Sequence, residues 1–126
     1  MSCKISNKAE IGKNFTHGEN VVIEADVVIG GNVEIGHNVV IRENVHIGDN
    51  CKILDGAVLG KMPAKASMSA TTGAARELPA LKIGKAVTVG AGCVLYRGAK
   101  INDMAFFGDL ATVREDVTIG EGTIIG

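Results

Sequence analysis

The sequence predicts an all-β fold, a parallel β-helix in which the chain winds into a triangular solenoid with 18 residues per coil. Large apolar residues recur every six positions from Ile11 to Leu59 and again from Ile83 to Ile125. A second apolar column of mostly small residues runs two positions before the first. Aromatic residues make up only 3% of the chain, as a narrow aliphatic interior requires. A β-sandwich does not produce an unbroken period of six, and helical spacing explains neither column.

Each six-residue unit is predicted to form a short strand followed by a tight turn. Alternation along the strand points two side chains inward and one outward. The turn often begins with glycine, and only His17 interrupts the large apolar column. In the first half, Asn or Asp stands three residues after the large position, where positive φ is tolerated, at Asn14, Asn20, Asp26, Asn32, Asn38, Asn44 and Asn50. Three units therefore make one coil, and the walls of the solenoid are three parallel sheets.

The repeat fails once, between Leu59 and Ile83. Continuing the step would place polar residues in the core, namely Lys65, Thr71 and Glu77. The phase is kept across the gap, so we predict one domain over residues 1–126 with an extruded loop at about 61–80. Long loops in compact domains are uncommon and usually functional. A solvent loop tolerated at a corner is the alternative.

The outward residues distinguish the walls. One wall carries polar residues at Thr16, Glu34 and Lys52, as a solvated surface does. Another carries an apolar column, the valine face, which consists of Val22, Val40, Val58 and Val94 and is continued by Thr112. An exposed apolar column of this length needs a partner. The sequence therefore predicts a homotrimer that packs this wall against a neighbour, with the loop leaving from the adjoining corner.

Composition excludes several classes of partner. The chain has 13 Lys and Arg against 14 Asp and Glu, which gives no electrostatic case for nucleic acid or an anionic membrane. It contains no apolar run long enough to span a bilayer and no secretory leader at its start. Three cysteines form neither a disulfide framework nor a zinc pattern. We expect a cytoplasmic protein.

His37 is the leading candidate for chemistry. It lies at the turn that enters the valine face, with Glu19 one coil below and Asp55 one coil above. Neighbouring coils lie about 4.8 Å apart, so a carboxylate could orient the imidazole. A histidine supported in this way could deprotonate an acceptor amine or hydroxyl. Histidine is also an ordinary filler of such a turn, and that interpretation stays open.

The other two histidines have weaker cases. His17 occupies an inward position of the first coil, where a structural or partly solvated role is expected. His46 points outward from a second wall, with Val28 one coil below and Lys82 one coil above. It is either a cleft residue or a surface histidine.

The repeat resembles the hexapeptide-repeat family, whose members are left-handed parallel β-helix acyltransferases. The resemblance implies left-handed coiling, trimers with active sites between subunits, and acyl-CoA or acetyl-CoA as co-substrate. In the acyl-thioester-dependent members, the catalytic histidine occupies the turn slot in an Ala-His-Asp or Ala-His-Asn context. Gly36-His37-Asn38 looks like that slot with Gly in place of Ala. The implied catalytic residues are His37 and, as its support, Asp55.

The metal-dependent branch of this fold, the gamma carbonic anhydrases, sets two histidines five residues apart because zinc needs converging imidazoles. Here Arg42 stands five residues after His37. A cation at a ligand position argues against that site, so no metal is expected.

Three segments resemble the N-terminal half of bacterial nucleotide-sugar N-acyltransferases, namely Gly60-Lys61-Met62-Pro63, Tyr96-Arg97-Gly98 and the stretch from Gly108 to Glu115. In that family the catalytic coils lie further along the β-helix than residue 126. The expected function is acyl transfer from a small-molecule donor to an amine or hydroxyl of a sugar or nucleotide-sugar. The alternative is a catalytically silent trimeric scaffold, or a fragment without the family's catalytic coils.

Overall fold

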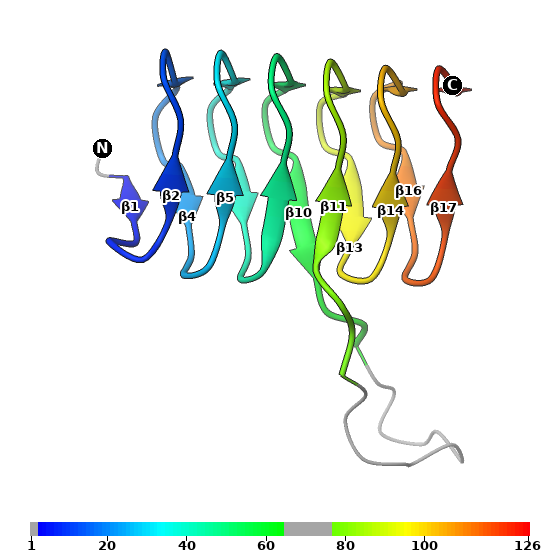
Figure 1. The fold of residues 1–126 in the computed structure, drawn as a ribbon, viewed down its shortest axis with the longest axis horizontal. Coiled ribbons are helices and arrows are strands. Elements are labelled where there is room, and N and C mark those ends of the chain that lie inside the picture. The colour runs from blue at the N-terminus through cyan, green and yellow to red at the C-terminus, as the bar shows by residue number, and fades with distance from the viewer. Residues whose placement is uncertain (1–2, 65–76) are drawn as a thin grey trace.

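The computed structural model describes residues 3–64 and 77–126, and these residues form eighteen short parallel strands and no helix. Figure 1 shows the strands stacked coil after coil along one axis, with the two ends of the chain at opposite ends of the solenoid. The strands belong to three six-stranded sheets, one for each wall. The predicted all-β solenoid is confirmed.

The three sheets take every third strand, and we call them sheets A, B and C. Sheet A consists of β1 (Lys4–Ile5), β4 (Val22–Ile23), β7 (Val40–Ile41), β10 (Val58–Lys61), β13 (Val94–Tyr96) and β16 (Thr112–Val113). Sheet B consists of β2 (Glu10–Ile11), β5 (Val28–Ile29), β8 (Val45–Ile47), β11 (Leu81–Ile83), β14 (Lys100–Ile101) and β17 (Thr118–Ile119). Sheet C consists of β3 (Thr16–His17), β6 (Glu34–Ile35), β9 (Lys52–Ile53), β12 (Thr88–Val89), β15 (Phe106–Phe107) and β18 (Ile124–Ile125).

Strand register confirms the 18-residue coil. Val22 pairs with Val40, and Val40 pairs with Val58. Val58 then pairs with Val94, across twice that separation, so the extra length between them equals one coil. The valine face therefore forms one continuous column on sheet A. These four valines are half-buried in the single chain, whereas the Thr112 that follows is exposed.

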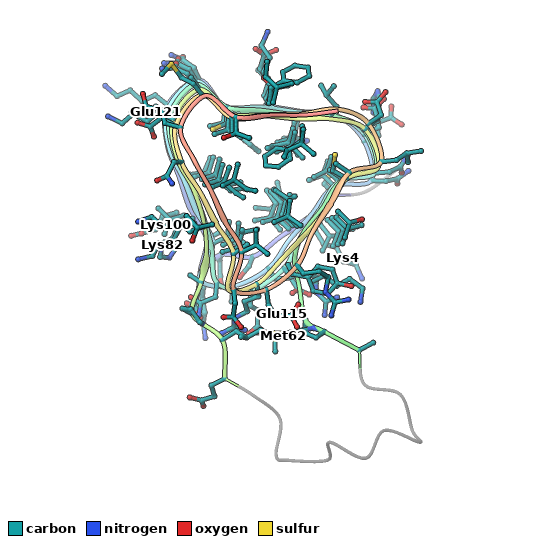
Figure 2. All side chains as sticks on the ribbon, turned by 90° about the vertical axis from the view of Figure 1, so that its right-hand side faces the viewer. Lys4, Met62, Lys82, Lys100, Glu115 and Glu121 are labelled. Atoms are coloured by element: carbon teal, nitrogen blue, oxygen red, sulfur yellow. The ribbon has the colours of Figure 1, made fainter. Side chains whose placement is uncertain are left out.

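The core is a stack of side chains along the axis, visible inside the triangular section in Figure 2. Most residues of both apolar columns are buried, and each buried aliphatic side chain contributes roughly 1.5–3 kcal/mol to folding. Burial weakens at the two ends, where a coil has a neighbour on one side only. Ile11 is 36% exposed and His17 is exposed, while Ile119 and Ile125 are half-buried.

One aromatic side chain occupies the interior, contrary to the expectation that aromatics would not fit. Phe107 is fully buried in the large apolar column. In its coil, the three small-column positions are all alanine, at Ala99, Ala105 and Ala111. The missing methyl groups offset the volume of the ring, so the narrow section is kept.

The turns use the predicted residues. All seven Asn and Asp residues expected at positive φ have φ between 57° and 63°. In the later coils the same position is taken by glycine or by residues with less tolerance for this conformation, such as Ala86 and Leu110.

The predicted loop begins one residue later than expected. Lys61 is the last residue of β10 and pairs with Tyr96 after a register shift at Gly60. Most of the predicted loop, residues 65–76, lies outside the described residues. Figure 1 shows the described ends, after β10 and before β11, running away from the solenoid at the corner between sheets A and B. We call this the loop corner.

Candidate functional site

His37 lies on the turn between β6 and β7, at the corner between sheets C and A. Its side chain is exposed and borders a shallow depression of about 400 Å³. The depression also contains Asp55, His17, Glu34 and Lys52, all within the neighbouring coils. The structure therefore brings the two predicted site residues, His37 and Asp55, into one depression.

The hydrogen bonds of His37 involve the backbone of the turns. The Glu19 backbone N–H donates to His37 Nδ1 over 2.8 Å. The His37 backbone N–H donates in turn to Asp55 Oδ1, also over 2.8 Å. The expectation that a carboxylate orients the imidazole is therefore corrected, because a backbone amide holds the ring and Asp55 holds the backbone of His37.

The same bond recurs with aspartate at other turns. Backbone N–H groups of Gly31, Lys85 and Ala91 donate to the Oδ1 atoms of Asp49, Asp103 and Asp109, each eighteen residues later. His37 thus occupies the place of a turn-capping aspartate. Glycine makes room one coil below, because a Cβ at Gly18 would collide with His37 Nδ1, and one at Gly36 would collide with Asp55 Oδ1.

This geometry determines the proton position on the imidazole. A nitrogen that accepts a hydrogen bond carries no proton, so the neutral ring holds its proton on Nε2. In this conformation His37 can donate from Nε2 but has no free lone pair with which to act as a base. Catalysis by His37 and Asp55 stays a prediction, and it requires the ring to release the Glu19 amide first.

The other histidines lie apart from His37. His46, on β8, is half-buried and pairs in register with Val28 and Lys82, as predicted. It borders a separate depression of about 540 Å³ with Asn7, Lys8, Glu10, Asp26 and Asn44. His17 Nδ1 lies 2.8 Å from the Gly18 carbonyl oxygen, and its ring stacks near Phe15, which supports a structural role.

The three segments that resemble nucleotide-sugar N-acyltransferases meet at the loop corner, where cations surround Tyr96; this contact was not predicted from the sequence. The Tyr96 ring is buried, with Arg114 Cζ at 4.3 Å and Lys61 Nζ at 5.1 Å from its centroid. These contacts are cation–π interactions. Arg114 Nε also donates to Glu115 Oε1 over 2.9 Å, and this hydrogen bond is the main cause that raises the pKa of the Arg114 guanidinium. The coil period places Arg114 eighteen residues after Tyr96, so that contact had a signal in the sequence, whereas Lys61 reaches Tyr96 only through the register shift at Gly60.

Beside this cluster, a depression of about 140 Å³ lies between the turns of successive coils. It is lined by Glu24, Arg42, Glu43, Gly60, Met62 and Arg97. Arg42 stands where the gamma carbonic anhydrases have a metal ligand, and its Nε donates to Glu24 Oε1 over 3.0 Å, so this cation is paired with a carboxylate. Figure 2 places Met62 and Glu115 at this corner, beside the described ends of the loop.

Within residues 3–64 and 77–126, no group of three or more His, Cys, Asp or Glu side chains is arranged to hold a metal ion. The same residues contain no helix able to cross a bilayer. Cys51 and Cys93 are buried, and burial raises the pKa of both thiols.

The repeat pattern matches a known family. Residues 8–43 and 26–61 match the family described as bacterial transferase hexapeptide (six repeats). The match covers residues 8–61, which is 54 of the 126 residues, and the fold of the whole chain is the left-handed parallel β-helix that the resemblance implied. Comparison with curated protein sequences gives no match.

Solved structures share this fold at low sequence identity. Perosamine N-acetyltransferase from Caulobacter crescentus, in complex with CoA and GDP-perosamine, has a TM-score of 0.78 and 20% identity over 97% of this chain and 50% of its own. LpxA from Bacteroides fragilis, a UDP-N-acetylglucosamine acyltransferase, has a TM-score of 0.74 and 21% identity over 97% and 55%. AntD from Bacillus cereus, an N-acyltransferase in complex with dTDP and coenzyme A, has a TM-score of 0.61 and 18% identity over 98% and 76%. The chain spans about half the length of the first two.

Proposed function

We propose that the chain is an acyltransferase, or the N-terminal part of one, that transfers an acyl group from acyl-CoA to an amine or hydroxyl of a sugar or nucleotide-sugar. The hexapeptide-transferase match over residues 8–61 carries this proposal. Support comes from similar structures that contain CoA together with a nucleotide-sugar or a nucleotide. The proposal places the protein in the cytoplasm.

In this proposal the protein is a homotrimer. The valine face leaves four half-buried apolar side chains in register on sheet A, and burying them against a neighbour would contribute to association. The loop corner borders the same sheet, so its cations and the loop ends would lie near the subunit boundary. A donor and an acceptor bound there would meet in a groove between two subunits.

The chemistry needs a base and a place for the donor. The acceptor's lone pair attacks the thioester carbonyl carbon, a C–N or C–O bond forms, and the C–S bond breaks. The acceptor's proton passes to a base, and the departing CoA thiolate takes up a proton. His37 is the candidate base, and Asp55 fixes its turn through the backbone bond of 2.8 Å.

The alternative function is a silent trimeric scaffold. One observation favours it, namely that His37 Nδ1 is already engaged by the Glu19 amide, as the aspartates at equivalent turns are. A chain whose leading candidate base caps a turn would keep the fold of the family without its reaction.

A transfer assay separates the two functions. The purified chain is incubated with acetyl-CoA or a longer acyl-CoA and a panel of amino-sugar nucleotides, and acylated product and free CoA are measured by mass spectrometry. Mass spectrometry is preferred to thiol reagents because Cys3 is only half-buried and would react with them. Formation of product with matching CoA release supports the enzyme. Absence of product with every acceptor, from a trimer of native stability, supports the scaffold.

A further inference from the structure

The loop corner contains Arg97, a cation whose Nε–H is left without a hydrogen-bond partner by the described residues. Arg97 follows β13, and its backbone N–H donates to the Lys61 carbonyl oxygen over 3.0 Å. This bond fixes Arg97 against the end of β10, at the start of the loop. Its side chain lines the 140 Å³ depression. In the part of the chain that the structure describes, Arg97 Nε is buried and has no hydrogen-bond partner.

An arrangement of this kind needs an explanation. A buried donor of a charged group that lacks an acceptor destabilises the folded chain relative to one that is paired. The planar guanidinium presents N–H groups in a fixed fork that matches the oxygens of phosphate. The depression holds the volume of a few water molecules, which is the scale of one tetrahedral oxyanion.

The neighbouring charges leave Arg97 available. Glu24 Oε1 accepts both from Arg42 Nε and from the Glu43 backbone N–H, each over 3.0 Å, so this carboxylate is already engaged. Lys61 follows Gly60 in the chain and extends over the Tyr96 ring, where it adds positive charge beside the depression. Glu43 also lines the depression, but within residues 3–64 and 77–126 neither it nor another carboxylate forms an ion pair with Arg97.

We infer that Arg97 binds a phosphate group of a substrate in this depression. The inference rests on the proposed function, because both the acyl-CoA donor and a nucleotide-sugar acceptor carry phosphates. On binding, the Arg97 guanidinium turns toward the depression, so that its Nε–H, buried in the free chain, and one terminal N–H donate to two phosphate oxygens. The Lys61 ammonium beside the depression adds positive charge. The phosphate comes either from the donor or from the acceptor, and the experiment below distinguishes them.

The test is calorimetric titration of the full chain with three probes, namely inorganic pyrophosphate, CoA and UDP. The variants are Arg97→Met, Arg97→Lys and, as a control with the same change of charge, Lys100→Met on the exposed face of sheet B. Losing a hydrogen bond to a charged group weakens binding about 10- to 100-fold, which is the effect expected of Arg97→Met. Arg97→Lys retains the charge without the fork and should lose less. Lys100→Met should bind as the unmodified chain does.

The melting temperature of the ligand-free chain provides a second readout. Because Arg97→Met removes an unpaired buried donor, its melting temperature should equal or exceed that of the unmodified chain. A lower melting temperature with unchanged pyrophosphate binding would show a structural arginine and overturn the inference. So would the absence of binding of all three probes to the unmodified chain.

The probes separate the sources of phosphate and the two proposals. An effect of Arg97→Met on CoA but not UDP assigns the phosphate to the donor, and the reverse assigns it to the acceptor. Pyrophosphate binding that depends on Arg97, in a chain that transfers no acyl group, supports this site and contradicts the proposed function. Acyl transfer with binding unaffected by Arg97→Met supports the function and overturns this site.

Discussion

Removing the side chain of His37 should destabilise the turn at the corner between sheets C and A, and asparagine should restore it. His37→Ala leaves the Glu19 backbone N–H, which now bonds to Nδ1 over 2.8 Å, without its protein acceptor. His37→Asn places an amide oxygen where Asp49, Asp103 and Asp109 place a carboxylate oxygen at the other turns. Asparagine adds no charge beside Asp55, so it is the cleaner replacement.

The expected magnitude follows from the exposure of the bond. A net hydrogen bond contributes about 0.5–1.5 kcal/mol, and because both Glu19 and His37 are exposed, water takes over part of it. The loss in His37→Ala should therefore be about 0.5–1 kcal/mol. For a domain of this size that corresponds to a fall of about 2–5 °C in melting temperature. His37→Asn should fall by less than half of that.

Urea titration followed by circular dichroism, together with calorimetry, measures both variants. If His37→Asn unfolds at the same urea concentration as His37→Ala, the bond to Nδ1 does not stabilise the turn and the structural reasoning fails. The same pair separates stability from catalysis in the transfer assay. If His37 is the base, both variants should lose activity by about 10²- to 10⁴-fold. If His37 only caps the turn, His37→Asn should keep the activity, because asparagine replaces the cap.

Three further predictions use matched controls. Val40→Glu should dissociate the proposed trimer in sedimentation velocity, whereas Val28→Glu, on sheet B, should not; a monomeric unmodified chain at micromolar concentration would contradict the trimer. Phe107→Ala should cost about 3–5 kcal/mol by leaving a cavity, whereas the neighbouring Phe106, 48% exposed, should cost far less; equal losses would contradict the assigned core. Iodoacetamide should label Cys3 in the native chain and reach Cys51 and Cys93 only in denaturant. Burial raises the pKa of these two thiols above 9.0. What they contribute to the free energy of unfolding is therefore full below that pH and is lost as pH rises through their pKa in the folded chain. Labelling of Cys51 or Cys93 before denaturant is added would contradict their burial.

The sequence was sufficient for the architecture because a single steric rule repeats in it. Every coil must place apolar side chains at the same two inward positions. The outward residues between them, Val22, Val40 and Val58, could therefore be assigned to one wall from the sequence alone. The Asn and Asp turn residues were predictable for the same reason, since their backbone conformation is a local property. Phe107 was harder, because its fit depends on three alanines spread around the coil.

The site was less predictable because it depends on individual hydrogen bonds, whereas the repeat predicts only which residues stack in one column. Stacking placed Asp55 above His37 correctly, yet the period of six does not state whether a side chain bonds to a ring or to a backbone amide. The environment of Arg97 depends on the register shift at Gly60, where the regular coil ends. The six-residue period predicts no contacts at the point where it is interrupted.

The pairing of Val58 with Val94 has a consequence for how such a chain can change. The segment between β10 and β11 adds one whole coil in length, and Leu81 still pairs with Val45. Strand pairing therefore continues across the insertion without a change of phase. The loop corner is therefore a splice point. Segments of different length or chemistry could be exchanged there, by evolution or by a protein engineer, while the solenoid continues to build from the same ladder of strands.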